Sequence, residues 1–390
     1  MVSSRRQDAL VLCLVGVLLA SRDARAQSAA DSTSGRGGNA DQHEQMQMNM
    51  NNGWQLMQDG IVFAEFNHQG GPRGGNEFVV PNWWMGMASR EMPRGRLTLT
   101  SMLSLDPATV GKDGYREILQ AGEAIDGHPL IDRQHPHDLF MQLAAVWRMP
   151  LTQSTGFTLA GGPVGEPALG PVAFMHRASA ADNPTAPLGH HTFDSTHIAF
   201  GVVTAAVDHG PFVVEGSVFN GREPDENRWD FDFGRFDSVS GRVWYRPSDE
   251  WEFQASSGRL KTPEELEPGD IVRSTLSASW TQKNGAAISS VTAAYGRNNT
   301  DVVNGPAADV KDPAIAFTVG GVRDFLSVRG FEGGIGADVT FYGVPDTLQP
   351  IYTSHPVSFH VFVRLRPPAA SMGRMWNMRM SQPMVGHQMP

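Results

Sequence analysis

The chain contains almost no cysteine. Among its 390 residues only Cys13 carries a thiol, and Cys13 lies in an N-terminal segment that we expect to be removed. A mature chain without cysteine cannot be a disulfide scaffold, the class to which many small secreted domains belong. Cysteine nucleophiles and thiolate zinc sites are excluded for the same reason.

Basic charge and long apolar segments are also scarce. The 31 lysines and arginines are outnumbered by 41 aspartates and glutamates, which gives a formal net charge of −10. Because phosphate binding requires a basic face, we expect no nucleic-acid partner. No run of eighteen apolar residues follows the first 26 residues, so no transmembrane helix is predicted. A low charge content of 18% with 42 glycines fits a transmembrane β-barrel as well as a soluble β-protein.

The N-terminal segment has the organisation of a secretory signal peptide. Arg5 and Arg6 precede an apolar run over residues 9–20, and the small-residue sequence Ala-Arg-Ala follows at residues 24–26. The apolar run is too short to span about 30 Å of hydrocarbon as a helix. We therefore expect residues 1–26 to be cleaved during export.

From Trp54 onward the sequence alternates between apolar and polar residues. In the segment 96–105, four leucines fall on one face of an extended chain, while Arg96, Thr98 and Thr100 fall on the other. Repetition of this pattern predicts about fourteen strands, at residues 54–68, 77–92, 95–106, 138–150, 155–164, 197–208, 211–221, 237–247, 251–260, 271–282, 286–297, 314–324, 328–343 and 357–366.

The connections between these strands alternate in length. Tight turns follow the second strand and every second strand after it, and mostly longer polar segments lie between them. Over about residues 54–366 the chain thus resembles Gram-negative outer-membrane β-barrel proteins, in pattern and not through a unique motif. The resemblance implies an all-β, transmembrane antiparallel barrel of about 14 strands (12–16), with short periplasmic turns and long outer loops. The alternative is a secreted soluble β-protein.

This resemblance also implies a location and a domain organisation. The barrel would lie in the cell outer membrane, in contact with its lipid, with both chain ends in the periplasm. We expect a disordered leader at residues 27–52, the barrel at residues 53–366 and a flexible, methionine-rich tail at residues 367–390. One departure concerns the last strand, since such barrels usually end in an aromatic residue and here Arg366 is followed by the tail.

Seven of the thirteen histidines lie between residues 128 and 197, in two clusters. His135 and His137 flank a proline, so both imidazoles lie on one face of an extended chain, an arrangement that can supply two zinc or copper ligands. We expect the loops 107–137 and 165–196 to pack together at the outer mouth and to bring the clusters within reach of each other. The alternative is a structural polar network. The candidate ligands in these loops are His128, His135, His137, Asp138, His176, His190, His191, Asp194 and His197.

Methionines form a third pattern. Met46, Met48 and Met50 precede the barrel, and six more lie between residues 372 and 389. Thioether sulfur is a soft ligand that favours Cu(I). In composition and layout, these tails are loosely similar to copper-resistance outer-membrane proteins, whose Met- and His-rich leaders precede a barrel. We expect both tails to hang in the periplasm, unless they are low-complexity sequence without a function.

Three functions follow from these patterns. The first is a barrel, or a narrow channel, that binds or moves soft metal ions such as copper. The second is an anion-preferring porin with structural histidines, because the predicted lumen face has surplus arginine: Arg96, Arg148, Arg242, Arg246, Arg273, Arg364 and Arg366. The third is a barrel-embedded hydrolase using Ser195 with Asp194 and His197, which we favour least because the chain lacks a G-x-S-x-G elbow. We therefore expect no enzyme; the partners would be small solutes or metal ions, and no pattern indicates an oligomeric state.

Overall fold

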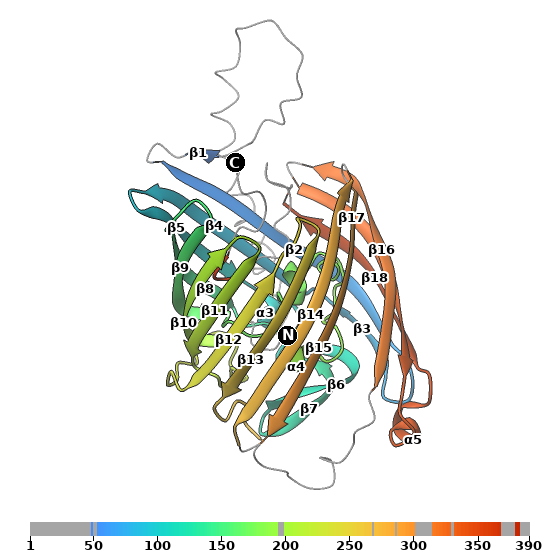
Figure 1. Ribbon diagram of the computed structural model, residues 1–390. Helices are drawn as coiled ribbons and strands as arrows, with labels where there is room; N and C mark the ends of the chain where they lie inside the picture. Colours follow the sequence, from blue (N-terminus) through green and yellow to red (C-terminus); the bar gives the residue numbers. More distant parts are fainter. Residues whose placement is uncertain are drawn as a thin grey trace, which may run out of the picture.

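The protein is a barrel of long antiparallel strands, seen in the computed structural model of Figure 1. The structure describes residues 48–49, 53–193, 199–266, 269–284, 287–300, 314–328, 331–367 and 379–382. Among these residues, no helix is long and apolar enough to cross a membrane.

Fourteen strands follow one another around the wall, at positions that confirm the predicted strands. They are β2 (Trp54–Gln69), β4 (Asn82–Met92), β5 (Gly95–Leu103), β8 (Phe140–Pro150), β9 (Thr155–Gly165), β10 (Ala199–His209), β11 (Phe212–Phe219), β12 (Ser238–Tyr245), β13 (Trp251–Leu260), β14 (Ile271–Asn284), β15 (Ala287–Thr300), β16 (Ile315–Val328), β17 (Phe331–Gly343) and β18 (Val357–Arg366). The last strand, β18, pairs with the first, β2, so the two ends of the barrel sequence lie side by side. Within the described residues, β15 and β16 are the two edge strands of this sheet.

The chain differs from the prediction at one strand and in several connections. The predicted strand 77–92 is interrupted at Pro81, which has no backbone N–H, and divides into β3 (Gly75–Val79) and β4, both paired with β2. The loop predicted at 107–137 contains a separate hairpin of β6 (Tyr115–Ile125) and β7 (His128–Gln134). Short elements occupy other connections: β1 (Met48–Asn49), α3 (Asp106–Thr109), η1 (Phe174–His176), α4 (His190–Phe193) and α5 (Gln349–Tyr352).

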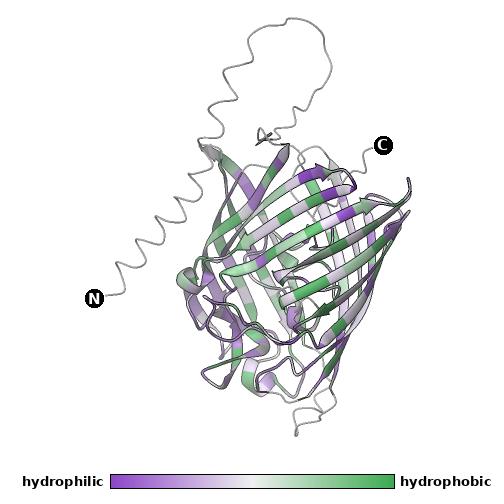
Figure 2. Ribbon diagram, turned by 90° about the vertical axis from the view of Figure 1, so that its left-hand side faces the viewer, coloured by the Kyte–Doolittle hydropathy of each residue, from purple (hydrophilic) through white to green (hydrophobic). Residues whose placement is uncertain are grey.

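Side-chain burial in the wall is the reverse of that in a soluble protein. On β11 and β12, Val214, Val218 and Val243 face outward and are exposed, whereas Glu215 and Arg242 face inward and are buried. Apolar residues recur along the outer surface of the strands (Figure 2). A wall that is apolar outside and polar inside is the arrangement that a surrounding lipid phase requires.

The long connection after β9 folds into the barrel. The backbone N–H of Ala168 donates to Ser217 Oγ at 2.7 Å, and that of Gly170 donates to Ser256 Oγ at 2.9 Å. The Arg242 guanidinium donates to the Gly170 carbonyl at 3.0 Å. Because Ser217, Ser256 and Arg242 all point inward from the wall, these contacts hold the connection against the inner face and narrow the lumen.

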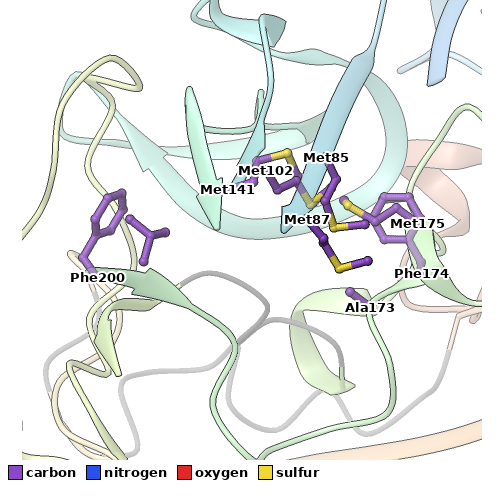
Figure 3. Close-up of a cluster of buried hydrophobic side chains, with 10 residues drawn as sticks. Met85, Met87, Met102, Met141, Ala173, Phe174, Met175 and Phe200 are labelled. Atoms are coloured by element: carbon purple, nitrogen blue, oxygen red, sulfur yellow. The ribbon is translucent and has the colours of Figure 1, made fainter. Parts of the chain in front are cut away.

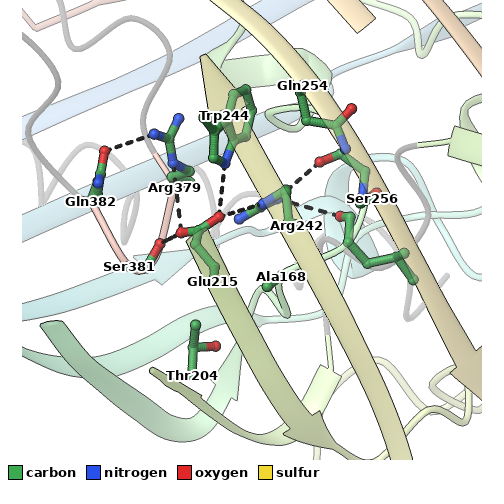
Figure 4. A network of polar contacts seen from close by, with 12 residues as sticks. Ala168, Thr204, Glu215, Arg242, Trp244, Gln254, Ser256, Arg379, Ser381 and Gln382 are labelled. Carbon is green, nitrogen blue, oxygen red and sulfur yellow. Dashed lines mark hydrogen bonds and ion pairs between the residues drawn. The ribbon is translucent and has the colours of Figure 1, made fainter. Parts of the chain in front are cut away.

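A short segment of the C-terminal tail also lies inside the barrel (Figure 4). The Arg379 guanidinium lies 3.9 Å from the centre of the Trp244 ring and 3.3 Å from Glu252, and Ser381 donates to Glu215. Met380 is buried in an apolar cluster of the lumen. Residues 379–382, which were expected in a flexible tail in the periplasm, thus contact inward-facing carboxylates and an indole. Residues 368–378 and 383–390 lie outside the described residues.

Six of the seven arginines expected to give the lumen a surplus of positive charge pair with carboxylates in the described residues, whereas Arg273 donates to the Asn298 amide oxygen at 2.9 Å. Arg242 contacts Glu215 at 2.6 Å and Glu166 at 3.2 Å, and Arg364 pairs with Asp182 and Asp324. Similar pairs neutralise other lumen arginines: Arg148 with Asp208, Arg246 with Glu252 and Arg366 with Asp182. The inward arginines thus stabilise loops and neighbouring strands, which removes the reason to expect an anion preference.

Candidate metal centre

A group of histidines and glutamates lies at the long-loop end of the barrel, positioned by the β6–β7 hairpin and by α4. The hairpin reverses at Asp126 and Gly127, whose positive φ angles of 49° and 73° suit a tight turn. Its first strand carries Glu123, and the chain leaving its second strand carries His135. The opposite loop supplies His190 and His191 at the start of α4.

Three imidazoles converge there. His135, His190 and His191 each offer a ring nitrogen, and these atoms lie within 4.8 Å of one another. The ring centres of His190 and His191 are 4.1 Å apart, and that of His135 lies 5.1 Å from His191 and 6.5 Å from His190. The predicted meeting of the two histidine loops is confirmed for these residues.

Hydrogen bonds orient two of the rings. His135 Nδ1 lies 3.0 Å from the Pro136 carbonyl, which can only accept, so this nitrogen carries the proton. His135 Nε2 then lies 3.0 Å from Glu123 Oε1. In the imidazolium form this nitrogen donates a second proton to the carboxylate, whereas in the neutral ring it presents its lone pair. Gln120 Nε2 lies 2.8 Å from His190 Nδ1 and 2.8 Å from Gln134 Oε1. This second set of contacts fixes His190 in place.

The carboxylate of Glu123 is also paired with a buried arginine. Arg228 contacts Glu123, and it contacts Asp138 at 3.3 Å. Burial acts to raise the pKa of Glu123, but the charges of His135 and Arg228 outweigh it and hold that pKa far below its ordinary value. Burial raises the pKa of Asp138 to about 6, even beside the arginine. Asp138, expected as a ligand or orienting group, therefore acts on the centre through Arg228.

A second carboxylate extends the group. Glu123, His191 and Glu223 form another set whose ligand atoms lie within 4.8 Å of one another. Burial and the neighbouring charge of Glu264 raise the pKa of Glu223 well above its ordinary value. Sequence reasoning missed Glu123, Glu223, Arg228 and Gln120. No local motif marks these residues, since each reaches the histidines only through the folded loops.

Other predicted ligands lie apart from the three imidazoles. His137 Nδ1 contacts Asp106 at 2.7 Å, and the His176 ring packs edge-on against Trp83 at 5.2 Å. His128 is exposed at the tip of the hairpin. Asp194, His197, Met46 and Met50 lie outside the described residues, and only the backbone of Met48 is described.

Methionines that the sequence patterns did not single out lie together inside the barrel beside this centre (Figure 3). Five are buried in one cluster with Phe174, and Phe174 in turn packs against His190 at a ring distance of 5.8 Å. They come from β4, β5, β8 and the lumen loop: Met85, Met87, Met102, Met141 and Met175. The only other buried side chains in the cluster are alanine, valine and phenylalanine, so thioethers are its only potential ligands.

The buried His176 predicts a pH-dependent stability. Burial lowers its pKa to about 4, from an ordinary value near 6.5. The unfolded chain therefore takes up the proton first, and stability present above pH 6.5 is lost as the pH falls toward 4, by up to about 3 kcal/mol. A His176→Phe variant keeps the contact with Trp83 and should lose this contribution. Urea unfolding at pH 7 and pH 4 measures it, and equal pH dependence in both proteins would contradict the assignment.

Comparisons with known proteins found similarity among solved structures. No protein-family model and no curated protein matches the chain. Similar solved structures include a loop-deletion mutant of OmpT, an outer membrane protein of Vibrio cholerae, with 9% identity and a TM-score of 0.40 over 80% of this chain and 99% of that one. Salmonella typhi OmpF (9%, 0.38, 82% and 99%) and a mutant porin of Rh. blastica (11%, 0.33, 80% and 100%) are similar too. Each of these is a likeness of fold alone, and the likeness to copper-resistance proteins stays a prediction.

Proposed function

We propose that this chain is an outer-membrane β-barrel that binds a zinc or copper ion at its outer mouth. The observation that carries the proposal is the convergence of His135, His190 and His191 beside Glu123. Three imidazoles and a carboxylate form a ligand set suited to Zn²⁺ or Cu²⁺. Arg228, Gln120 and the Pro136 carbonyl supply the outer contacts that orient such ligands.

The reversed burial of the wall supports the location in a membrane. Valine, phenylalanine and tryptophan side chains of β10 to β18 face outward over most of the barrel surface. An apolar surface of this extent would promote aggregation in water, but it is matched by a lipid bilayer. Residues 1–26 would direct export and be removed, and the long-loop end would face the outside, as in other barrels of this architecture.

The methionine cluster favours copper over zinc as the ion that is moved. Five buried thioethers share a cluster with Phe174, and the Phe174 ring lies 5.8 Å from that of His190. Thioether sulfur binds Cu(I) far better than it binds Zn²⁺. These soft ligands would therefore hold copper that enters the barrel as Cu(I).

Occlusion of the lumen favours a narrow channel over a general porin. The connection after β9 and residues 379–382 both occupy the interior, and the inward arginines are paired with carboxylates. Small ions would have to pass between these segments. An anion-preferring porin would need unpaired positive charge along an open path, and among the seven predicted lumen arginines only Arg273 lacks a carboxylate partner in the described residues.

The proposal is tested by metal titration of the full-length protein folded in detergent or lipid. Replacing His135 with alanine should weaken binding of Cu²⁺ and Zn²⁺ at the mouth at least about 100-fold, since loss of an outer contact alone typically costs 10–100-fold. His128→Ala is the matched control, because His128 lies on the same hairpin but is exposed. Equal affinity in the two variants would contradict the proposed centre.

A further inference from the structure

The inner face of the wall contains a site that holds the guanidinium of Arg379 (Figure 4). Trp244 of β12 presents its indole to Arg379, whose guanidinium carbon lies 3.9 Å from the ring centre. Arg379 Nη1 donates to Glu252 of β13 at 3.3 Å, and Arg379 Nε lies 3.8 Å from Glu215 of β11. All four residues are buried, so bulk water does not screen these contacts.

Contacts within the wall position the parts of this site. Trp244 Nε1 donates to Glu215 at 2.8 Å, which fixes the orientation of the indole. The Arg242 guanidinium donates to the same carboxylate at 2.6 Å and lies 5.1 Å from the centre of the Trp244 ring. Arg246 lies 3.6 Å from Glu252. Because none of these contacts involves the tail, the indole face and the two carboxylates keep their places without it.

The chemistry of the site suits a planar cation. A guanidinium stacks on an aromatic face and donates in its plane to carboxylates, whereas an ammonium is a compact and strongly hydrated charge. Arg379 makes both kinds of contact, with the Trp244 ring and with Glu252. The site lies beside the short turn between β12 and β13, so a solute would reach it from the end of the barrel opposite the long loops.

The tail arginine does not use the whole site. Arg379 Nε has no hydrogen-bond partner among the described residues, because 3.8 Å from Glu215 Oε1 is too far for a hydrogen bond. Arg379 Nη2 donates at 2.7 Å to Gln382 of the tail itself and not to the wall. Ser381 of the tail occupies Glu215 Oε1 as a donor. Release of the tail therefore frees this oxygen, and an untethered guanidinium can approach it closely enough to donate.

We propose that Trp244, Glu215 and Glu252 form a binding site for small guanidinium solutes such as arginine, and that Arg379 occupies it as an intramolecular competitor. A short flexible tether gives a side chain an effective concentration of about millimolar. A solute displaces Arg379 only when its own concentration is comparable. Displacement releases residues 379–382 from the wall, which couples binding of the solute to opening of the lumen.

The test measures binding of L-arginine by equilibrium dialysis to the full-length Arg379→Ala variant, folded in detergent. This variant should bind one equivalent, and the wild type should bind about tenfold more weakly or less, because its own arginine fills the site. L-citrulline carries a neutral urea group in place of the guanidinium and should not bind. Adding Trp244→Leu to Arg379→Ala should weaken binding of L-arginine about tenfold or more, through loss of a desolvated cation–π contact.

Arg259→Ala is the matched control for this experiment. Arg259 lies on the same strand as Glu252 and pairs with Asp270, but its side chain is 59% exposed, so its loss leaves no buried site. This variant should bind L-arginine no better than the wild type does. The proposal is overturned if Arg379→Ala binds no L-arginine, if it binds L-citrulline equally well, or if Arg259→Ala binds L-arginine as tightly as Arg379→Ala.

If Arg379→Ala does not fold, displacement of the tail can be followed with Arg379 in place. Cys13 is the only cysteine of the chain and lies in the expected signal peptide, so Ser381→Cys gives the mature protein a single thiol. Ser381 is buried, so a maleimide should modify this thiol slowly. L-arginine above the effective concentration of the tethered side chain should accelerate the modification, and L-citrulline should not. Equal rates with the two solutes would overturn the proposal.

Discussion

Removal of residues 368–390 should raise the ion conductance of the barrel in planar lipid bilayers severalfold. Arg379 lies against Trp244 and Glu252, Ser381 donates to Glu215, and Met380 is buried among side chains from other strands of the wall. These contacts hold the segment inside a lumen already narrowed by the connection after β9. Without the segment, water replaces it, and ions pass through the space that it occupied.

A shorter truncation provides the control for this experiment. A chain ending at Gln382 loses residues 383–390 but keeps the whole described segment, so its conductance should equal that of the wild type. An Arg379→Ala variant should show an intermediate conductance, since it removes the two contacts with Trp244 and Glu252. Equal conductance of all three proteins would show that the connection after β9 alone limits the pore.

Replacing Glu123 with alanine should lower the free energy of unfolding by about 3–5 kcal/mol, the usual cost of breaking a buried ion pair. Glu123 is the partner of both His135 and Arg228, and Arg228 is only 4% exposed. Its removal leaves the guanidinium with Asp138 alone, at 3.3 Å. The β6–β7 hairpin should then separate from the loop that carries α4, and mouth metal binding should be lost with it.

Asp126→Ala is the matched control on the same hairpin. Asp126 pairs with Lys112 at 2.8 Å, but both side chains are about two-thirds exposed. Exposed ion pairs contribute about 0–1 kcal/mol, so this variant should unfold almost as the wild type does. Unfolding in urea, followed by tryptophan fluorescence, compares the two variants. A similar small effect of both would mean that Arg228 is well solvated without Glu123.

The strands could be predicted from the sequence because each one carries its own signal. Side chains of a strand alternate between its two faces, so apolar residues at every second position mark the face that contacts lipid. In a membrane barrel nearly every strand has such a face, and nearly every strand therefore shows the alternation. The boundaries of β9, β13 and β18 agree with the prediction to within one residue. The break at Pro81 could also have been foreseen, because proline cannot donate to a sheet ladder.

The candidate centre could be predicted only in part. The two histidine clusters can be recognised in the sequence, because seven of the thirteen histidines lie between residues 128 and 197. Both clusters lie in loops next to neighbouring strands, which indicated that they would be close in space. Glu123, Glu223 and Arg228 could not be found this way, since long-range packing of the loops brings them together. Arg228 lies 105 residues from Glu123 in the chain and 90 from Asp138.

The buried methionine cluster could not be predicted from the sequence either. Methionine is concentrated in the two tails of the sequence, but the buried cluster takes two methionines from β4 and one each from β5, β8 and the loop after β9. Met85 and Met87 share the inward face of β4, and nothing in that strand alone separates them from ordinary core residues. Arg379 of the tail binds Glu252, 127 residues earlier in the chain, which no local pattern predicts.

X-ray absorption at the metal edge tests the central claim most directly. The folded, full-length protein, loaded with one equivalent of Cu²⁺ or Zn²⁺, should show scattering from several imidazole rings, with nitrogen and oxygen at about 2.0–2.1 Å. Replacing His135 and His191 together with alanine should abolish the imidazole scattering and leave oxygen from water. A spectrum that is the same with and without these two histidines, or one that contains only oxygen ligands in the parent, would contradict a metal centre at the mouth.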